Sequence, residues 1–123
     1  GFFLWSKVST LKKINIIKKN TEFNSIINEG KPYKNKYYPI YVINKKEKYY
    51  RIGIAIPKKT GIAVIRNKIK RQIKDIIDKS SLNNLNFDCI IIVRRNILDL
   101  NYEYMKKYLL ELLSRINEEN KYE

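Results

Sequence analysis

The first repeat of apolar positions in the chain predicts a short helix over residues 21–29. Its apolar members are spaced three and four residues apart and share one face: Phe23, Ile26 and Ile27. Asn20 or Thr21 can cap the start of this helix with a side-chain oxygen, and Gly30 suits its end.

Two longer stretches repeat apolar residues at the same helical period. In residues 64–79 the apolar positions are Ile65, Ile69, Ile73, Ile76 and Ile77. After Asp99 they are Tyr102, Met105, Leu109, Leu112, Leu113 and Ile116. Each set predicts an amphipathic helix whose apolar stripe packs in the core.

Three further segments predict strands. Residues 37–43 are β-branched and aromatic, and Pro39, which lacks an N–H, indicates an edge position or a bulge there. A polar turn over 44–48 leads to residues 49–56, which alternate. One face of this strand carries Ile52, Ile54 and Ile56, and the other, flatter face carries Arg51, Gly53 and Ala55. Residues 87–93 form a nearly continuous apolar run, typical of a strand buried on both faces.

The resulting order is helix, two or three strands, helix, strand, helix, which predicts an α+β sandwich built on one sheet. No repeat or linker interrupts the sequence, so we expect a single domain over residues 1–123. The apolar start is far shorter than the ~20 residues that span a bilayer, and we interpret residues 1–10 as a flexible or docking arm. Because residue 1 is Gly instead of Met, these residues are left out of the functional argument.

The charge of the chain favours a polyanionic partner, with nucleic acid the leading candidate. There are 26 Lys and Arg against 12 Asp and Glu, a net charge of +14. The number of lysines alone is weak evidence, because Ile, Asn, Lys and Tyr are all abundant, as expected from an A/T-rich genome. Position is more informative, since residues 58–74 hold seven basic residues and no acid.

The composition also excludes several kinds of chemistry. With no His and one Cys, the chain has no His-based catalysis, no ordinary zinc site and no internal disulfide. Cys89 adjoins an apolar run, where its small side chain suits the core, and its lack of a partner fits a reducing cytoplasm. We expect neither a catalytic residue nor a metal ligand in this chain.

Helical geometry places the basic residues of the acid-free segment on one side. At ~100° per residue, Asn67, Lys68, Lys70, Arg71 and Lys74 lie opposite the isoleucine stripe, with Arg66 at the margin. Like charges three and four residues apart destabilise an isolated helix by a few tenths of a kcal/mol per pair, roughly, and RNA phosphates would offset that cost. The alternative is a solvated basic face.

Two other functions stay open on these observations. One is a structural or ribosomal RNA-binding protein whose RNA is not catalytic. The other is a basic protein that lies on an anionic membrane through its 66–79 helix. The apolar stripe of that helix has no Trp or Phe, which disfavours insertion into a membrane interface.

The acid-free segment resembles the signature of the ribonuclease P protein family. Residues 66–71 (RNKIKR) are similar to its Arg-Asn-Arg motif, and residues 58–64 (KKTGIAV) to the Lys-Lys-x-Gly-Asn-Ala-Val stretch before it. The resemblance extends over residues 11–30, 51–53 and 90–94. At two positions the sequence departs: Ile62 replaces the usual Asn, and Lys68 replaces the second Arg, which keeps the charge but loses the bidentate fork.

This resemblance implies a fold, a function and partners. The fold would be α-β-β-β-α-β-α, similar to ribosomal protein domain 2, with a left-handed βαβ crossover against the usual right-handed rule. The function would be that of a subunit of a cytoplasmic endoribonuclease, a ribonucleoprotein whose RNA subunit carries the active site and holds most of the Mg²⁺. The protein would bind that catalytic RNA and the 5′ leader of precursor tRNA, without a membrane or a further protein partner.

The resemblance also implies which residues contact RNA. The matching positions of the signature are Lys58, Lys59, Arg66, Asn67, Lys68, Lys70, Arg71 and Lys74. The cleft for the leader, between the first helix and the sheet, would contain Phe23, Ile27 and Tyr41. Rings at Phe23 and Tyr41 offer stacking surfaces worth about 1–3 kcal/mol per base, whereas Ile27 stands where an aromatic is common. Plain core packing is the alternative for all three.

Overall fold

The computed structural model describes residues 15–45, 49–80 and 85–120. Residues 1–10, expected to form an arm, and part of the 44–48 turn lie outside the described residues. The elements follow the predicted order: α2 (Asn20–Glu29), β1 (Lys31–Tyr33), β2 (Ile40–Asn44), β3 (Ile52–Ala55), the 3₁₀ turn η2 (Lys58–Thr60), α3 (Ala63–Lys79), β4 (Phe87–Ile92), the 3₁₀ turn η3 (Arg95–Asp99) and α4 (Tyr102–Asn120).

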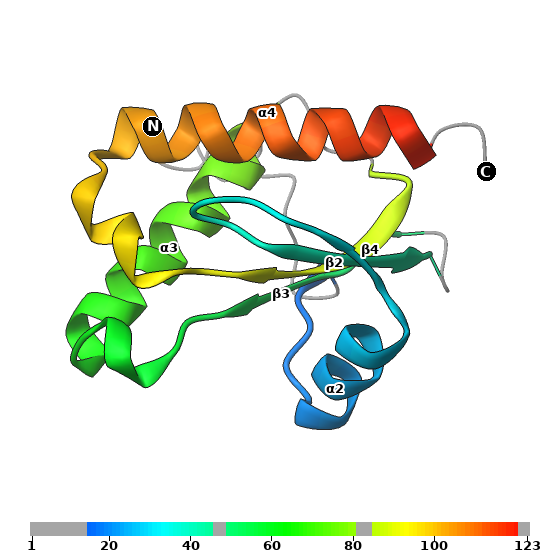
Figure 1. The fold of residues 1–123 in the computed structure, drawn as a ribbon, viewed down its shortest axis with the longest axis horizontal. Coiled ribbons are helices and arrows are strands. Elements are labelled where there is room, and N and C mark those ends of the chain that lie inside the picture. The colour runs from blue at the N-terminus through cyan, green and yellow to red at the C-terminus, as the bar shows by residue number, and fades with distance from the viewer. Residues whose placement is uncertain (1–14, 46–48, 81–84, 121–123) are drawn as a thin grey trace, which may run out of the picture.

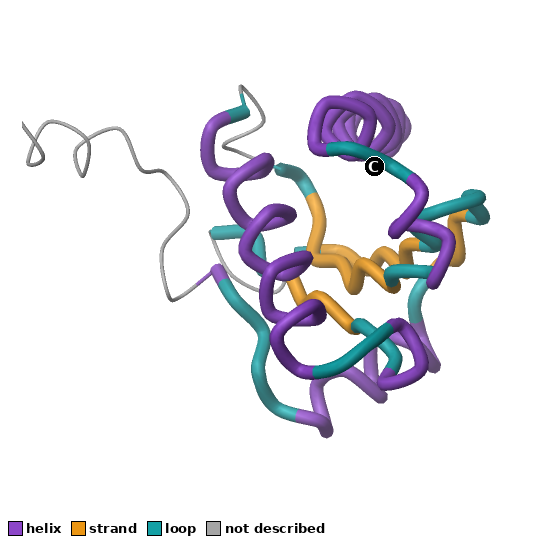
Figure 2. The backbone as a smooth tube through the Cα atoms, turned by 90° about the vertical axis from the view of Figure 1, so that its left-hand side faces the viewer, coloured by secondary structure: helices purple, strands orange, loops and turns teal. Residues whose placement is uncertain are grey.

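The four strands form one mixed sheet in the order β1-β2-β4-β3. The β1–β2 and β2–β4 pairs are antiparallel, whereas β3 and β4 are parallel and are joined through α3, as the family fold requires. α4 lies along one face of the sheet and α2 lies against the other (Figure 1). Viewed from the side, the strands occupy the middle of the molecule with helices around them (Figure 2). The α+β class with a single sheet is therefore confirmed.

The main core fills the space between the sheet, α3 and α4. α4 buries its predicted stripe almost completely, at Met105, Leu109, Leu112, Leu113 and Ile116. α3 buries Ile69, Ile73, Ile76 and Ile77, but Ile65 is 38% exposed, so its assignment to the core was wrong. Ile65 lies in the first turn of α3, one turn before the helix meets the core. Cys89 is fully buried in β4 as predicted, and burial raises the pKa of its thiol far above its ordinary value.

Two details of the strand and cap predictions were wrong. β2 starts at Ile40 and pairs with β1 on one side and β4 on the other, so Pro39 does not mark an edge strand. Pro39 instead precedes the strand, where its carbonyl accepts the N–H of Ile92 at 2.8 Å. The N-cap prediction also fails, because α2 starts at Asn20 and its N-cap residue, Lys19, makes no side-chain cap hydrogen bond, whereas Gly30 is the C-cap residue as predicted.

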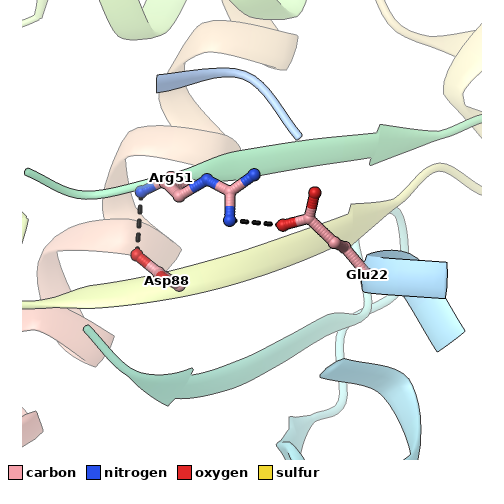
Figure 3. Close-up of polar contacts among 3 residues, drawn as sticks. All are labelled: Glu22, Arg51 and Asp88. Atoms are coloured by element: carbon pink, nitrogen blue, oxygen red, sulfur yellow. Dashed lines mark hydrogen bonds and ion pairs between the residues drawn. The ribbon is translucent and has the colours of Figure 1, made fainter. Parts of the chain in front are cut away.

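The flat face of β3 allows α2 to approach the sheet closely. Gly53 is buried, and a Cβ there would lie 2.8 Å from Cζ of Phe23. A polar network holds the same helix in place: the Arg51 guanidinium pairs with Glu22 of α2, and the Arg51 backbone N–H donates to Asp88 of β4 at 2.9 Å (Figure 3). Small side chains on one face of β3 thus set the position of the Phe23 ring.

Candidate nucleic-acid interface

The residues predicted to bind RNA gather on η2 and on the outer side of α3, and we call them the ridge. Its members are Lys58, Lys59, Arg66, Asn67, Lys68, Lys70, Arg71 and Lys74. All are exposed except Arg66 and Lys74, which are half-buried. Arg66 is held by its own turn, because its Nε donates to the carbonyl of Gly61 at 3.1 Å. The remaining side chains point away from the isoleucine core, as the helical period predicts.

No acid in the described part of the chain neutralises the ridge. Its cations form no ion pair with any residue that the structure describes. Asp75, the first acid after the ridge, accepts a hydrogen bond from the hydroxyl of Tyr102 at 2.8 Å and forms an ion pair with Lys79 at 3.2 Å. The hydrogen bond from Tyr102, followed by that from Lys79, lowers the pKa of Asp75, so it stays a carboxylate directed to α4 and its own helix. The positive field of the ridge is left for an external anion.

A hollow of about 840 Å³, the cleft, opens between α2, the end of β3 and α3. α2 contributes Phe23 and Ile27 to its wall, and α3 contributes Lys70 and Lys74. Burial, followed by the positive charges of Lys70 and Lys18, lowers the pKa of Lys74. An anion in the cleft would relieve the repulsion among these three lysines. The cleft therefore has two kinds of wall. One is apolar and carries the Phe23 ring, and the other is cationic and consists of lysines that also belong to the ridge.

A family model described as Ribonuclease P matches residues 11–117. The chain belongs to the ribonuclease P protein family.

Relatives and solved structures of ribonuclease P proteins match this chain over most of its length. The ribonuclease P protein component of Mycoplasma capricolum is 43% identical over 108 residues, covering 86% of this chain and 99% of the relative. That of Streptococcus agalactiae is 34% identical, covering 84% and 94%. A Staphylococcus aureus RNase P protein mutant with defective mRNA degradation activity superposes with a TM-score of 0.78 at 32% identity, covering 94% and 97%. The Thermotoga maritima RNase P protein gives 0.72 at 28% identity, covering 80% and 94%.

Membership makes this chain a protein subunit of ribonuclease P, an endoribonuclease complex of tRNA processing that works with an RNA component. No helix in the described part of the chain is long and apolar enough to cross a membrane. Among the described residues, no three His, Cys, Asp or Glu side chains gather closely enough to hold a metal ion.

The three residues predicted for the leader cleft of this ribonuclease P protein do not share one hollow. Phe23 and Ile27 line the cleft together. Tyr41 packs in the same apolar cluster as these two side chains, on the α2 face of the sheet, but it lines a different hollow near β1. All three are half-buried, so each combines packing with an accessible surface.

Sequence reasoning missed several side chains of the cleft. Lys18, Asn20 and Asn24 lie along its wall on the α2 side. The segment before α2 reaches this position because the N–H of Ile17 donates to the carbonyl of Ile52 at 2.8 Å, which places it beside β3. The sequence shows two consecutive lysines, Lys18 and Lys19, before α2. Only the hydrogen bond of this segment to β3 shows that Lys18 faces the lysines of α3.

Proposed function

We propose that this ribonuclease P protein binds the catalytic RNA along the ridge and the 5′ leader of precursor tRNA in the cleft. The RNA subunit would hydrolyse the phosphodiester bond and release the mature 5′ end. One observation carries the proposal: Lys70 and Lys74 belong both to the ridge and to the cleft wall opposite Phe23. A single-stranded leader that leaves the folded RNA at α3 thus meets the cationic wall first and the Phe23 ring next.

Each group has a definite role in this proposal. Arg71 can contact a phosphate through two parallel N–H bonds, whereas each lysine acts as a point charge. The ring of Phe23 offers a face for an unpaired base. The described residues do not form a cluster suited to Mg²⁺, so we assign no step to a metal held by the protein. The protein would act by neutralising phosphate charge and fixing the leader beside the active site.

Reconstitution tests this function directly. The protein is mixed with a ribonuclease P RNA of a related bacterium, and cleavage of a precursor tRNA is measured at low Mg²⁺. We expect cleavage that depends on the protein and yields the mature 5′ end. Equal turnover with and without the protein, together with equal binding of the catalytic RNA and an unrelated structured RNA, would exclude the proposal.

Removing the ring of Phe23 should weaken leader binding without unfolding the domain. Phe23→Leu keeps an apolar side chain above Gly53 but loses the stacking face, and we expect about tenfold weaker binding of precursor tRNA, at the lower end of the 1–3 kcal/mol typical of base stacking. Phe23→Tyr keeps the ring and should bind as the unmodified protein does. Binding of mature tRNA, which lacks a leader, serves as the reference and should not change. A similar loss for Phe23→Tyr would mean that Phe23 acts through packing alone.

A further inference from the structure

A second hollow, the edge groove, lies at the β1 edge of the sheet, and the described residues that line it include rings and cations but no acid. Its volume is about 760 Å³, close to the 840 Å³ of the cleft. β1 and β2 contribute Tyr33 and Tyr41, the loop between them contributes Lys34 and Lys36, and Arg94 follows β4. The groove is about as large as the hollow already proposed for the leader.

The chemistry of the edge groove suits unpaired nucleic acid. Lys34, Lys36 and Arg94 are exposed. Two cations next to the groove lie beside rings. Nζ of Lys31, outside the groove lining, is 5.3 Å from the ring centre of Tyr33, and Nζ of Lys36 is 5.4 Å from that of Tyr37, which lines a neighbouring hollow. Alternating cations and aromatic rings are how proteins bind single strands, with phosphates on the cations and bases on the ring faces.

The loop that forms one wall of the groove is held rigidly. Oδ1 of Asn35 accepts the N–H groups of Tyr37 and Tyr38 at 2.9 and 3.0 Å. Nδ2 of Asn96 donates to the carbonyl of Lys36 at 3.0 Å, and the N–H of Arg94 donates to the carbonyl of Tyr37 at 3.0 Å. These bonds use only the backbone of Lys36 and Arg94, and both side chains stay exposed, with the ammonium of Lys36 beside the Tyr37 ring. A wall fixed in advance loses little conformational entropy when a ligand binds.

The edge groove is next to the cleft. Tyr41 lines the groove and packs in one apolar cluster with Phe23 and Ile27 of the cleft wall. On β4 and the residues after it, Ile92 lines the cleft and Arg94 lines the groove. From β3 to β1 the sheet extends over three strand spacings, about 14 Å, so the groove lies on the side away from the ridge.

We propose that the edge groove is a second subsite for the leader, which takes nucleotides upstream of those in the cleft. The inference rests on the proposed function of the cleft. Leader nucleotides close to the cleavage site lie beside the catalytic RNA, and so beside the ridge. Nucleotides farther upstream continue past Tyr41 to the opposite edge of the sheet, where Lys34, Lys36 and Arg94 contact their phosphates. A longer leader therefore binds more tightly than a short one.

The test compares precursor tRNAs with leaders of about 4 and about 12 nucleotides, both within the range of roughly 4–16 nucleotides common for single-strand sites. Affinity is measured for the reconstituted holoenzyme at 0.1 M salt. The unmodified protein should bind the long leader on the order of 100-fold more tightly, as expected if three cations each neutralise a phosphate of a single strand at about fivefold per contact. The combined variant Lys34→Gln, Lys36→Gln and Arg94→Gln should remove that gain and leave the affinity for the short leader unchanged.

A matched variant on α4 controls for the lost charge. Lys106→Gln, Lys107→Gln and Arg115→Gln remove the same three positive charges from exposed sites outside both hollows of the leader path. This variant should keep the gain from the longer leader. A groove variant that keeps the gain, or that weakens short and long leaders equally, overturns the second subsite, as does an unmodified protein that gains nothing from leader length. These results would not contradict the proposed role of the cleft. An unmodified holoenzyme that does not bind the short-leader precursor would exclude the proposed function itself.

Discussion

Replacing Lys68, Lys70 and Arg71 of the ridge with Gln should weaken binding of the ribonuclease P RNA on the order of 100-fold at 0.1 M salt. Each neutralised phosphate releases counterions, and at this salt concentration that release contributes roughly five- to eightfold per contact. The three side chains are exposed and form no ion pair with described residues, so nothing inside the protein offsets their loss.

The salt dependence of binding separates this effect from a general loss of charge. If the protein neutralises about 4 to 6 phosphates, log affinity should fall against log salt with a slope of roughly −3 to −5. The ridge variant should have a slope smaller in magnitude by about 2 to 3. The α4 variant Lys106→Gln, Lys107→Gln and Arg115→Gln has the same net charge and should keep the original slope. Equal slopes for the ridge variant and the unmodified protein would show that the ridge does not contact phosphate.

The fold should survive this substitution, which circular dichroism and urea unfolding can check. The buried side of α3 consists of isoleucines, and none of the three replaced side chains contributes to it. Arg66 is left out of the variant because its Nε bonds to the carbonyl of Gly61 and supports the turn before α3. A replacement there would combine lost RNA contact with a loosened turn, and the two effects would be difficult to separate.

Local periodicity was sufficient to predict most of the fold. Apart from Ile65, the stripes on α3 and α4 and the continuous apolar run of β4 are buried as expected, because the period of each element can be seen in consecutive residues. The order of strands is different in kind. It depends on which strands meet, and the resemblance implied only that the signature helix joins two parallel strands. The resemblance also implied a third strand before that helix, but β1 could not be located because three residues, Lys31–Tyr33, are too few to show any period.

The candidate site also has parts that local spacing predicts and parts that depend on which segments meet in the fold. Most of the ridge could be predicted because six of its eight residues lie on α3, where spacing alone determines the face; Lys58 and Lys59, on η2, were supplied by the resemblance. The resemblance supplied Phe23 and Ile27 of the cleft, but spacing could not supply its lysines, because Lys18 and Lys74 meet there only after the segment before α2 has paired beside β3. Tyr41 was assigned to the cleft by family resemblance, and the structure places it where the cleft and the edge groove adjoin.

Gly30→Ala should destabilise the domain by about 3 kcal/mol, an effect at the upper end of those seen for overpacking. Gly30 has φ −75° and ψ 155°, which any residue adopts, so its requirement is space and not conformational freedom. Its N–H donates to the carbonyl of Ile26 at 2.7 Å. A Cβ would collide with that same carbonyl oxygen and would lie 3.2 Å from the carbonyl oxygen of Val42. Backbone surrounds the site on both sides, and neither α2 nor β2 can yield without loss of hydrogen bonds.

Gly53→Ala provides the matched comparison for this prediction. The added Cβ there meets side-chain ends, Cδ1 of Ile90 at 2.5 Å and Cζ of Phe23 at 2.8 Å, which can rotate away. We therefore expect a loss of only about 1 kcal/mol in urea unfolding, with weaker binding of precursor tRNA because the Phe23 ring is displaced. If Gly30→Ala costs no more than Gly53→Ala, the backbone around Gly30 gives way more easily than its close contacts indicate.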